Sequence, residues 1–349
     1  MSAATPLLDL APAQLRQNLE SLGEPTYRAQ QILSWVYQQG ARDFESMTDL
    51  PLALRARLAE IYAVHSHREL ARSTAPDGTT KLLLAWADGA TTETVMIPAP
   101  PSSIRRTACV STQVGCDVGC RFCASGIGGS QRNLTVAEIM EQTLAIDGML
   151  RDRQERLSHV VFMGMGEPLA NYEATVEAVR RMNADWGLGL AQRRITISTV
   201  GLPRQIERLA DESLQITLAL SLHAPTDELR EELIPWARGV SLSRLLEACR
   251  VYRRKTGREI TLEYCLLAEV NDHREHARQL ADIASGLDAH ISLLVYNPVQ
   301  GLPFARPSRN RAIDFLKRLR QLGAKAHLRE SRGLEADAAC GQLRRRNRD

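Results

Sequence analysis

The sequence contains no apolar run close to the roughly 18 residues that a membrane helix needs. Its first residues, MSAATPLLDLAPAQ, also lack the basic segment followed by an apolar one that marks a secretory leader. These absences exclude a helical membrane protein. We therefore expect a cytoplasmic protein without a membrane partner.

Lysine and aromatic side chains are also scarce. Among the 44 basic residues only Lys81, Lys255, Lys317 and Lys325 are lysines, and aromatic residues make up 5% of the chain. Arginine suits phosphate recognition because its planar fork presents several donors. However, the net charge is only +3 and the pI is near 8.5, below the value of about 9 that is typical of a strongly basic nucleic-acid-binding domain. A coding preference for arginine explains the bias equally well, so charge does not decide the function.

The chain has the composition of an ordinary globular protein, with 44% hydrophobic and 24% charged residues in a length of 349. Apolar periodicity predicts a small N-terminal module of helices at residues 15–23, 27–38 and 52–62. Three short strands, separated by turn formers, follow within residues 67–97. The length suits one large domain accompanied by a small one.

Beyond residue 100, short apolar runs alternate six times with helix-like segments. This rhythm indicates βα units and a parallel sheet, whose strands carry the chemistry at their carboxyl ends. We predict an α/β fold, a partial (β/α)6 barrel preceded by the helical module and a β-hairpin region, with a short extra strand at Ala326–Arg329. The six runs are TACVST, SHVVFMG, RITIST, QITLALSLH, EITLEYCLL and HISLLVYN.

Four of the seven cysteines fall within fifteen residues, which suits a metal site better than a disulfide framework. The spacing Cys116-x3-Cys120-x2-Cys123 follows the first of these strands. Three thiolates so spaced can hold three irons of a [4Fe-4S] cluster and leave the fourth iron open to S-adenosylmethionine (SAM). The motif resembles the radical-SAM superfamily signature. The alternative is a structural zinc site that takes a fourth ligand such as Cys109.

Glycines and polar side chains gather at the ends of the later strands. Gly166 permits close backbone approach, and the Glu167 carboxylate can accept hydrogen bonds from an ammonium group. This Gly-Glu pair resembles the element by which radical-SAM enzymes hold the methionine amino group. Taken singly, each of these residues is also explained as a strand-end cap. The predicted cofactor-binding residues are Gly166, Glu167, Ser198, Ser221, Leu222, His223 and Asn297.

Cys340 lies in a polar C-terminal segment, where a tail folded over the barrel mouth would present a reactive thiol. We interpret Cys249 and Cys265 as small buried hydrophobes. With the Cys340 segment included, the sequence closely resembles the RlmN/Cfr family of radical-SAM RNA methyltransferases over nearly its whole length. The matching stretches are ACVSTQVGCDVGCRFCASGIGG, RNLTVAEI, FMGMGEPLAN, ISTVG, LSLHAP, YNP and DAACGQL.

The resemblance implies a reaction that uses two SAM molecules per turnover. Cys340 takes a methyl group from one by displacement, and the second yields a radical that removes a hydrogen atom from the S-methyl group. The carbon radical then adds to adenine, whose C2 is too electron-poor to attack a sulfonium methyl itself. Cys109 resolves the protein–RNA crosslink by forming a disulfide with Cys340, and Glu93 accepts the proton from the former methyl carbon.

The resemblance also implies the substrates and the electron donor. These are C2 of an adenosine in the peptidyl-transferase region of 23S rRNA, the tRNA adenosine 3′ of the anticodon, and a donor such as flavodoxin or ferredoxin. Methylation at C8 of the same adenine, a radical-SAM activase or peptide modifier, and a zinc-dependent RNA binder stay open as alternatives. Candidate phosphate contacts are Arg193-Arg194, Arg253-Arg254-Lys255 and the terminal RRRNRD, although a solvated surface or a frayed tail explains each one better when taken alone.

These features divide the chain into four parts. Residues 1–66 form an N-terminal helical accessory domain that is expected to contact RNA, and residues 67–100 form a β-hairpin and linker. Residues 101–330 form the radical-SAM partial barrel, and residues 331–349 form the tail that carries the methylated cysteine.

Overall fold

Ten strands form one sheet within residues 4–99 and 103–344, the part of the chain that this computed structural model describes. In their order across the sheet, the strands are β14 (Ala326–Arg329), β13 (His290–Val295), β12 (Ile260–Leu266), β11 (Thr217–Ser221), β10 (Ile195–Thr199), β9 (His159–Phe162), β6 (Arg106–Cys109), β5 (Thr91–Pro98), β4 (Thr80–Ala85) and β3 (Arg68–Thr74). The strands from β6 to β14 run parallel, whereas β5, β4 and β3 are antiparallel.

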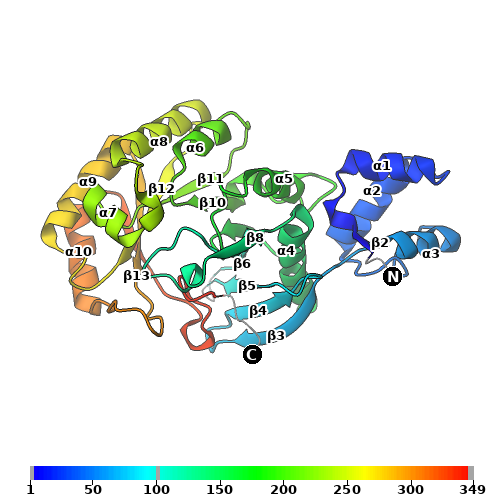
Figure 1. Ribbon diagram of the computed structural model, residues 1–349, viewed down its shortest axis with the longest axis horizontal. Coiled ribbons are helices and arrows are strands. Elements are labelled where there is room, and N and C mark those ends of the chain that lie inside the picture. Colours follow the sequence, from blue (N-terminus) through cyan, green and yellow to red (C-terminus); the bar gives the residue numbers. More distant parts are fainter. Residues whose placement is uncertain (1–3, 100–102, 345–349) are drawn as a thin grey trace.

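Helices connect the parallel strands and cover their outer face (Figure 1). They are α4 (Val136–Arg151), α5 (Tyr172–Asn183), α6 (Pro203–Leu209), α7 (Asp227–Leu233), α8 (Leu242–Thr256), α9 (Arg274–Leu287) and α10 (Arg309–Gln321). Each predicted apolar run contains one strand of the sheet, and β14 has the predicted bounds. The partial (β/α)6 barrel is therefore confirmed, with β14 and β3 at the two edges of the sheet.

Local sequence explains where the helices begin and which face they bury. Thr135 caps α4 through a capping box, because its hydroxyl accepts a hydrogen bond from the Glu138 N–H while the Glu138 carboxylate accepts one from the Thr135 N–H. On α8, Leu245, Cys249 and Tyr252 follow one another at helical spacing, and all three are buried. Such apolar stripes hold the helices against the sheet.

The N-terminal helices stand at one end of the long axis of the molecule, beside α4 and α5 (Figure 1). Arg181 of α5 donates hydrogen bonds to the Leu8 and Leu10 carbonyls, and Asp9 accepts one from the Ala137 N–H of α4. The elements of this region are β1 (Thr5–Pro6), a 3-10 turn (Leu7–Asp9), α1 (Pro12–Ser21), α2 (Tyr27–Ser34), a π-helical turn (Trp35–Gln39), α3 (Leu52–Ile61) and β2 (Tyr62–Ala63).

The strands predicted within residues 67–97 are present as β3 to β5. They do not stand apart from the barrel, because β5 pairs with β6 and thereby continues the barrel sheet. In this pairing Val95 lies opposite Cys109. The hairpin region therefore forms a wall of the barrel mouth.

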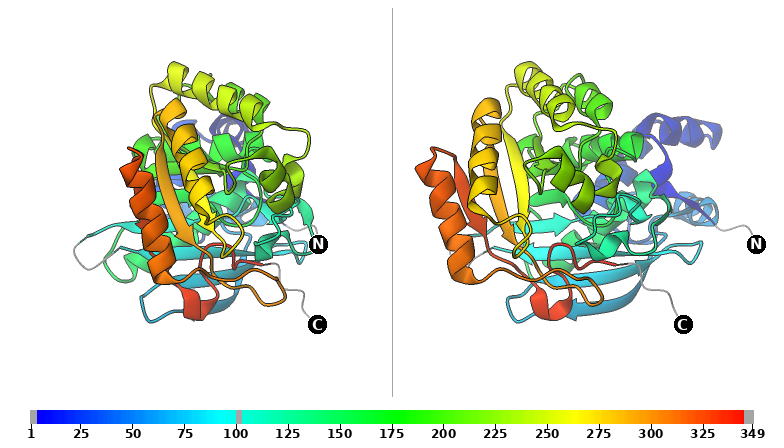
Figure 2. Two further views of the ribbon diagram at one scale, coloured as in Figure 1. Left: turned by 90° about the vertical axis from the view of Figure 1, so that its left-hand side faces the viewer. Right: turned by 60° about the vertical axis from the view of Figure 1, so that its left-hand side comes forward.

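After β14 the chain turns back and passes beside β4 and β5 on the open side of the barrel (Figure 2). Hydrogen bonds to the hairpin strands and their turn help to hold this segment: Lys81 Nζ donates to the Asp337 carbonyl at 2.9 Å, and the Gly333 N–H donates to Asp77 Oδ2 at 3.0 Å. Further 3-10 turns lie at Ala124–Gly126, Gln192–Arg194, Pro235–Ala237 and Leu334–Ala336. No helix in the described residues is long and apolar enough to span a bilayer.

Candidate functional site

The three clustered cysteines lie on a loop between two short antiparallel strands, β7 (Gln113–Gly115) and β8 (Ser130–Asn133). Gly115 has a φ of +86°, and a Cβ there would approach the Gly129 carbonyl oxygen to 2.1 Å, so glycine is required at this turn. The loop is tied inward by a hydrogen bond from the Arg121 N–H to the Leu233 carbonyl at 3.0 Å. All three thiols line one cavity at the carboxyl ends of the barrel strands.

The electrostatics of this loop disfavour three free thiolates and favour thiolates whose negative charge is balanced by a bound cationic group. Burial raises the pKa of Cys116 to about 12, and burial also raises the pKa values of Cys120 and Cys123. Arg230 of α7 is 1% exposed and lies close enough to favour the Cys120 thiolate. Its Nε has no hydrogen-bond partner among the described residues. Three thiolates beside a buried cation suit an anionic iron–sulfur cluster.

Glu167, at the end of β9, is 3% exposed and is held by backbone donors. One carboxylate oxygen accepts a hydrogen bond from the Val200 N–H at 2.8 Å, and the other accepts one from the Leu169 N–H at 2.9 Å. Burial raises the pKa of Glu167 to about 7 against these hydrogen bonds. Beside it, Gly166 has a φ of +103°, and a Cβ there would lie 2.7 Å from the Gln113 Cβ.

The ends of β10 and β11 supply further polar groups. Ser198 Oγ and Ser221 Oγ lie 3.1 Å apart, and both residues line the cavity. His223 Nδ1 accepts a hydrogen bond from the Cys265 N–H at 3.0 Å, and burial, followed by the Arg230 charge, lowers the His223 pKa to about 3. His223 therefore stays a neutral imidazole. Leu222, by contrast, is fully buried in the hydrophobic core and is not among the residues that line the cavity.

The C-terminal segment folds over the mouth of the barrel, as predicted, and carries Cys340 into the cavity wall. The Ala124 N–H donates to the Gly341 carbonyl at 2.8 Å, and Ser125 Oγ donates to the Leu343 carbonyl at 2.6 Å. Asn297, at the end of β13, donates to the Cys340 carbonyl at 3.1 Å. The cysteine loop and the last barrel unit thus hold the Cys340 segment from two sides.

Cys109 and Cys340 line the same cavity, although they are far apart in the sequence. Burial raises the pKa of Cys109 to about 12, and the neighbouring Cys340 adds to this effect. Cys340 is exposed to solvent, but the cavity walls desolvate its thiolate and raise its pKa. Arg329 of β14 opposes the increase at both thiols. All seven cysteines are free thiols in this structure.

Glu93 lies on β5, 1% exposed, and is not among the residues that line the cavity. Its Oε1 forms an ion pair with Lys81 Nζ at 3.1 Å, and its Oε2 accepts a hydrogen bond from the Arg344 N–H at 3.0 Å. Lys81 also holds the Asp337 carbonyl. The same lysine therefore fixes Glu93 and the segment that leads to Cys340.

Several of these placements were outside the reach of the sequence patterns. Cys265 fits its interpretation as a buried hydrophobe only in part: it packs against a hydrophobic cluster, but it is partly accessible and lines the cavity beside Cys340 and Cys123. Cys249 is buried as predicted. No motif singled out Lys81, Arg230 or Arg329.

The candidate phosphate contacts lie at the opposite end of the barrel. Arg193-Arg194 directly precede β10, and Arg253-Arg254-Lys255 end the helix before β12, so both groups lie at the amino ends of the strands. The second group is already engaged in exposed ion pairs with Asp288, Glu247 and Asp211. The terminal RRRNRD lies outside the described residues, apart from Arg344.

Comparisons with known proteins agree with this geometry. Residues 5–64 match the family described as the N-terminal domain of the ribosomal RNA large subunit methyltransferase, and residues 110–281 match the radical SAM superfamily. A crystal structure of a radical SAM methyltransferase from Sphaerobacter thermophilus superposes with a TM-score of 0.94 at 44% identity, covering 97% of this chain and 99% of that one. Fold and site thus define a SAM-dependent radical methyltransferase.

Curated relatives narrow this class. A probable dual-specificity RNA methyltransferase RlmN of Thermosynechococcus vestitus is 50% identical over 338 residues, which are 97% of this chain and 98% of the relative. Its counterpart in Gloeobacter violaceus is 50% identical over 344 residues, which are 98% and 96% of the two chains. The chain belongs to the RlmN family. Membership carries with it a [4Fe-4S] cluster and SAM, and the three thiols and the cavity beside them fit both.

Proposed function

We propose that the chain methylates C2 of an adenosine in the peptidyl-transferase region of 23S rRNA and of the tRNA adenosine 3′ of the anticodon. The proposal is supported by two relatives at 50% identity that are named as probable dual-specificity RNA methyltransferases. The observation that carries it is the position of Cys340, a thiol held by a folded-back tail at the cavity that the three loop cysteines line.

In this proposal Cys116, Cys120 and Cys123 hold the cluster, and the remaining polar groups of the cavity hold SAM. Gly166 leaves room for the methionine part, and Glu167 faces its ammonium group. Ser198, Ser221, His223, Asn297 and the backbone of Leu222 bind the remainder of the cofactor. When bound, the cluster and SAM together supply a 5′-deoxyadenosyl radical, for which a flavodoxin or a ferredoxin provides the electron.

Cys340 accepts a methyl group from the first SAM by displacement, and its S-methyl group loses a hydrogen atom when the second SAM is cleaved. The resulting carbon radical would add to C2 of the adenine, and the adduct would lose one electron, which the bound cluster can take back, and the C2 hydrogen as a proton, so that an S–CH2–C2 bond links the protein and the RNA. The Cys109 thiolate then attacks the Cys340 sulfur and breaks its bond to that carbon, which takes up protons to become the methyl group, and a Cys109–Cys340 disulfide remains for later reduction. Both thiols line one cavity, as this step requires.

Glu93 is the proposed acceptor of the proton that the former methyl carbon loses. Its ion pair with Lys81 keeps the carboxylate in place, and its Oε2 becomes available once the Arg344 N–H releases it. We therefore assign Lys81 as a positioning residue. The adenine must leave its stack to reach this depth. The N-terminal helices, none of whose residues lines the cavity, are the proposed grip on the RNA.

The decisive experiment is the Cys340→Ala substitution in anaerobically reconstituted enzyme. RNA methylation is expected to fall below detection, because no thiol remains to carry the methyl group, while reductive SAM cleavage to 5′-deoxyadenosine persists. A Cys249→Ala variant, which alters a buried core thiol, is the matched control. Methylation that survives Cys340→Ala would overturn the proposal. Mass spectrometry of the modified nucleoside distinguishes C2 from C8, and separate rRNA and tRNA assays test each substrate.

A further inference from the structure

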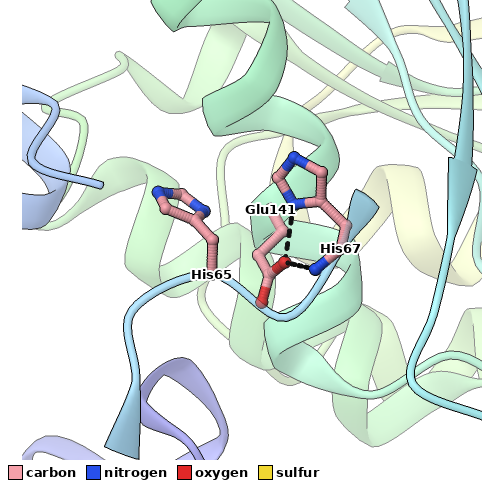
Figure 3. A group of neighbouring side chains, drawn as sticks. All are labelled: His65, His67 and Glu141. Carbon is pink, nitrogen blue, oxygen red and sulfur yellow. Dashed lines mark hydrogen bonds and ion pairs between the residues drawn. The ribbon is translucent and has the colours of Figure 1, made fainter. Parts of the chain in front are cut away.

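Two histidines and a glutamate meet where the N-terminal helices join the barrel, outside the cavity described above. His65 and His67 lie between β2 and β3, and Glu141 projects from α4 (Figure 3). One nitrogen of each imidazole and one carboxylate oxygen lie within 4.8 Å of one another. None of the three residues has a part in the proposed reaction.

The Glu141 side chain is fully buried, and its hydrogen-bond donors come from Ser66 and His67. Its oxygens accept hydrogen bonds from Ser66 Oγ at 2.9 Å, from the His67 N–H at 2.9 Å and from His67 Nδ1 at 2.7 Å. The site therefore contains a buried carboxylate that is hydrogen-bonded to an imidazole.

His65 supplies the second, independent observation. Its Nδ1 is buried and has no hydrogen-bond partner within the described part of the chain. The ring forms a hydrogen bond with the backbone of Ala41, and Nδ1 is the ring nitrogen that is left without a partner. Figure 3 shows this side of the ring turned toward Glu141 and His67. A buried ring nitrogen without a partner beside a carboxylate is a place where a cation can bind.

We propose that His65, His67 and Glu141 form a binding site for a divalent transition-metal ion, for which Zn²⁺ is the best fit. Two imidazole nitrogens and one carboxylate oxygen are a common set of three protein ligands for zinc, with water in the fourth position. Imidazole ligands also disfavour Mg²⁺ and Ca²⁺. Zinc bonds of about 2.1 Å place tetrahedral ligands roughly 3.4 Å apart, so small side-chain rotations suffice.

The ion takes the place of the proton between His67 Nδ1 and Glu141. That proton moves to His67 Nε2, or to water when the ring is doubly protonated, so no other reactant is needed. Ser66 continues to orient the carboxylate, and Ala41 continues to orient the His65 ring, as outer-shell partners do in metal sites. Since His65 adjoins the N-terminal helices and Glu141 belongs to the barrel, the ion fastens the two parts together.

The test uses cluster-loaded enzyme, because unloaded loop cysteines would themselves bind zinc. The protein is equilibrated with buffered Zn²⁺, zinc and iron are quantified, and the zinc ligands are read by X-ray absorption. We expect one zinc per chain beyond the cluster, with nitrogen and oxygen ligands that include imidazole. His65→Gln, which leaves the His67–Glu141 pair intact, should weaken zinc binding at least tenfold.

His273→Gln serves as the matched control, since His273 is exposed and lies beside a second histidine, His276, at a ring separation of 5.3 Å. It should bind zinc as the wild type does, and both variants should retain cluster iron. The proposal is overturned if loaded wild-type enzyme binds no zinc, if the zinc is bound by sulfur, or if His65→Gln binds zinc equally well. Methylation plays no part in these readouts, so they are independent of the proposed function.

Discussion

The two ends of the barrel use the same residue types in opposite ways. At the carboxyl ends of the strands, charged groups are buried and held by fixed partners, as Glu167 is by two backbone N–H groups. At the amino ends, the charged groups that end α8 are exposed, and so are their partners. Lys255 and Asp211 lie 2.5 Å apart there with side chains 46% and 64% exposed. The difference lies in solvation and not in composition.

Solvation decides what each arrangement can do. An exposed ion pair gains little, because water and salt screen the attraction and two long side chains lose freedom. A buried charge is expensive to leave without its partner, so its protonation state and position are tightly determined. The mouth therefore has groups with perturbed pKa values in fixed places, which is what chemistry needs. The exposed ion pairs at the amino ends of the strands only contribute a hydrated, charged surface.

The largest effect is expected from removing a thiol at the mouth. Cys120→Ala should leave the reconstituted protein with far less cluster iron and lower 5′-deoxyadenosine formation by at least about 10³-fold, since one iron loses its protein ligand. Iron and sulfide analysis together with the cleavage assay measures this. Cys249→Ala on the barrel's outer helix should retain both, and equal losses in the two variants would contradict the assignment.

The second effect concerns the buried pair at the mouth. Lys81→Met should lower the free energy of unfolding by about 3–5 kcal/mol, because it removes the ion-pair partner of the buried Glu93 carboxylate. Denaturant unfolding measures the loss. Combining it with Glu93→Gln should restore much of the stability, whereas additive losses in the double variant would show that the two residues do not act as a pair.

The third effect is a dependence on pH. The pKa of Glu167 is about 7 in the folded chain against 4.5 as its ordinary value. Below pH 4.5 the carboxyl group is protonated in both the folded and the unfolded chain, so its ionisation does not lower the stability of the fold there. As the pH rises through this interval only the unfolded state ionises, so stability falls, by about 3 kcal/mol at roughly 1.4 kcal/mol per pKa unit. Unfolding of the SAM-free protein between pH 4.5 and 8, compared with Glu167→Gln, checks the sign. A stability difference that rises with pH would contradict it.

The smallest effect is expected at the opposite end. Lys255→Ala should change the free energy of unfolding by no more than about 0.5 kcal/mol, because its partner and its own ammonium group stay hydrated. RNA methylation should also be unchanged. A large loss of RNA binding in Lys255→Ala would show that this surface contacts phosphate. It would contradict the conclusion that only the carboxyl end of the barrel is functional.

Hydrophobic periodicity and cysteine spacing were sufficient for much of the fold. Ala326–Arg329 forms a strand with the predicted bounds, and each of the six apolar runs contains a strand, because both signals are local along the chain. The predicted helix at residues 27–38 begins at Tyr27, but it passes into a π-helical turn after Ser34. No local sequence pattern predicts this change from α-helix to π-helix.

The residues that share a site are often far apart in the sequence, and they become neighbours only when the chain folds. Lys81 is an ordinary lysine in the sequence, and only the pairing of β4 with β5 together with the returning tail brings it to Glu93 and Asp337. Arg253-Arg254-Lys255 form a basic run, yet helix direction places them away from the mouth. Local spacing thus specified the strands, the helices and the cysteine loop, since these depend on near neighbours. Burial and long-range packing determined the shifted pKa values at the barrel mouth, the partners of its charged side chains and the position of Cys340. These properties depend on desolvation and on contacts that exist only in the folded chain.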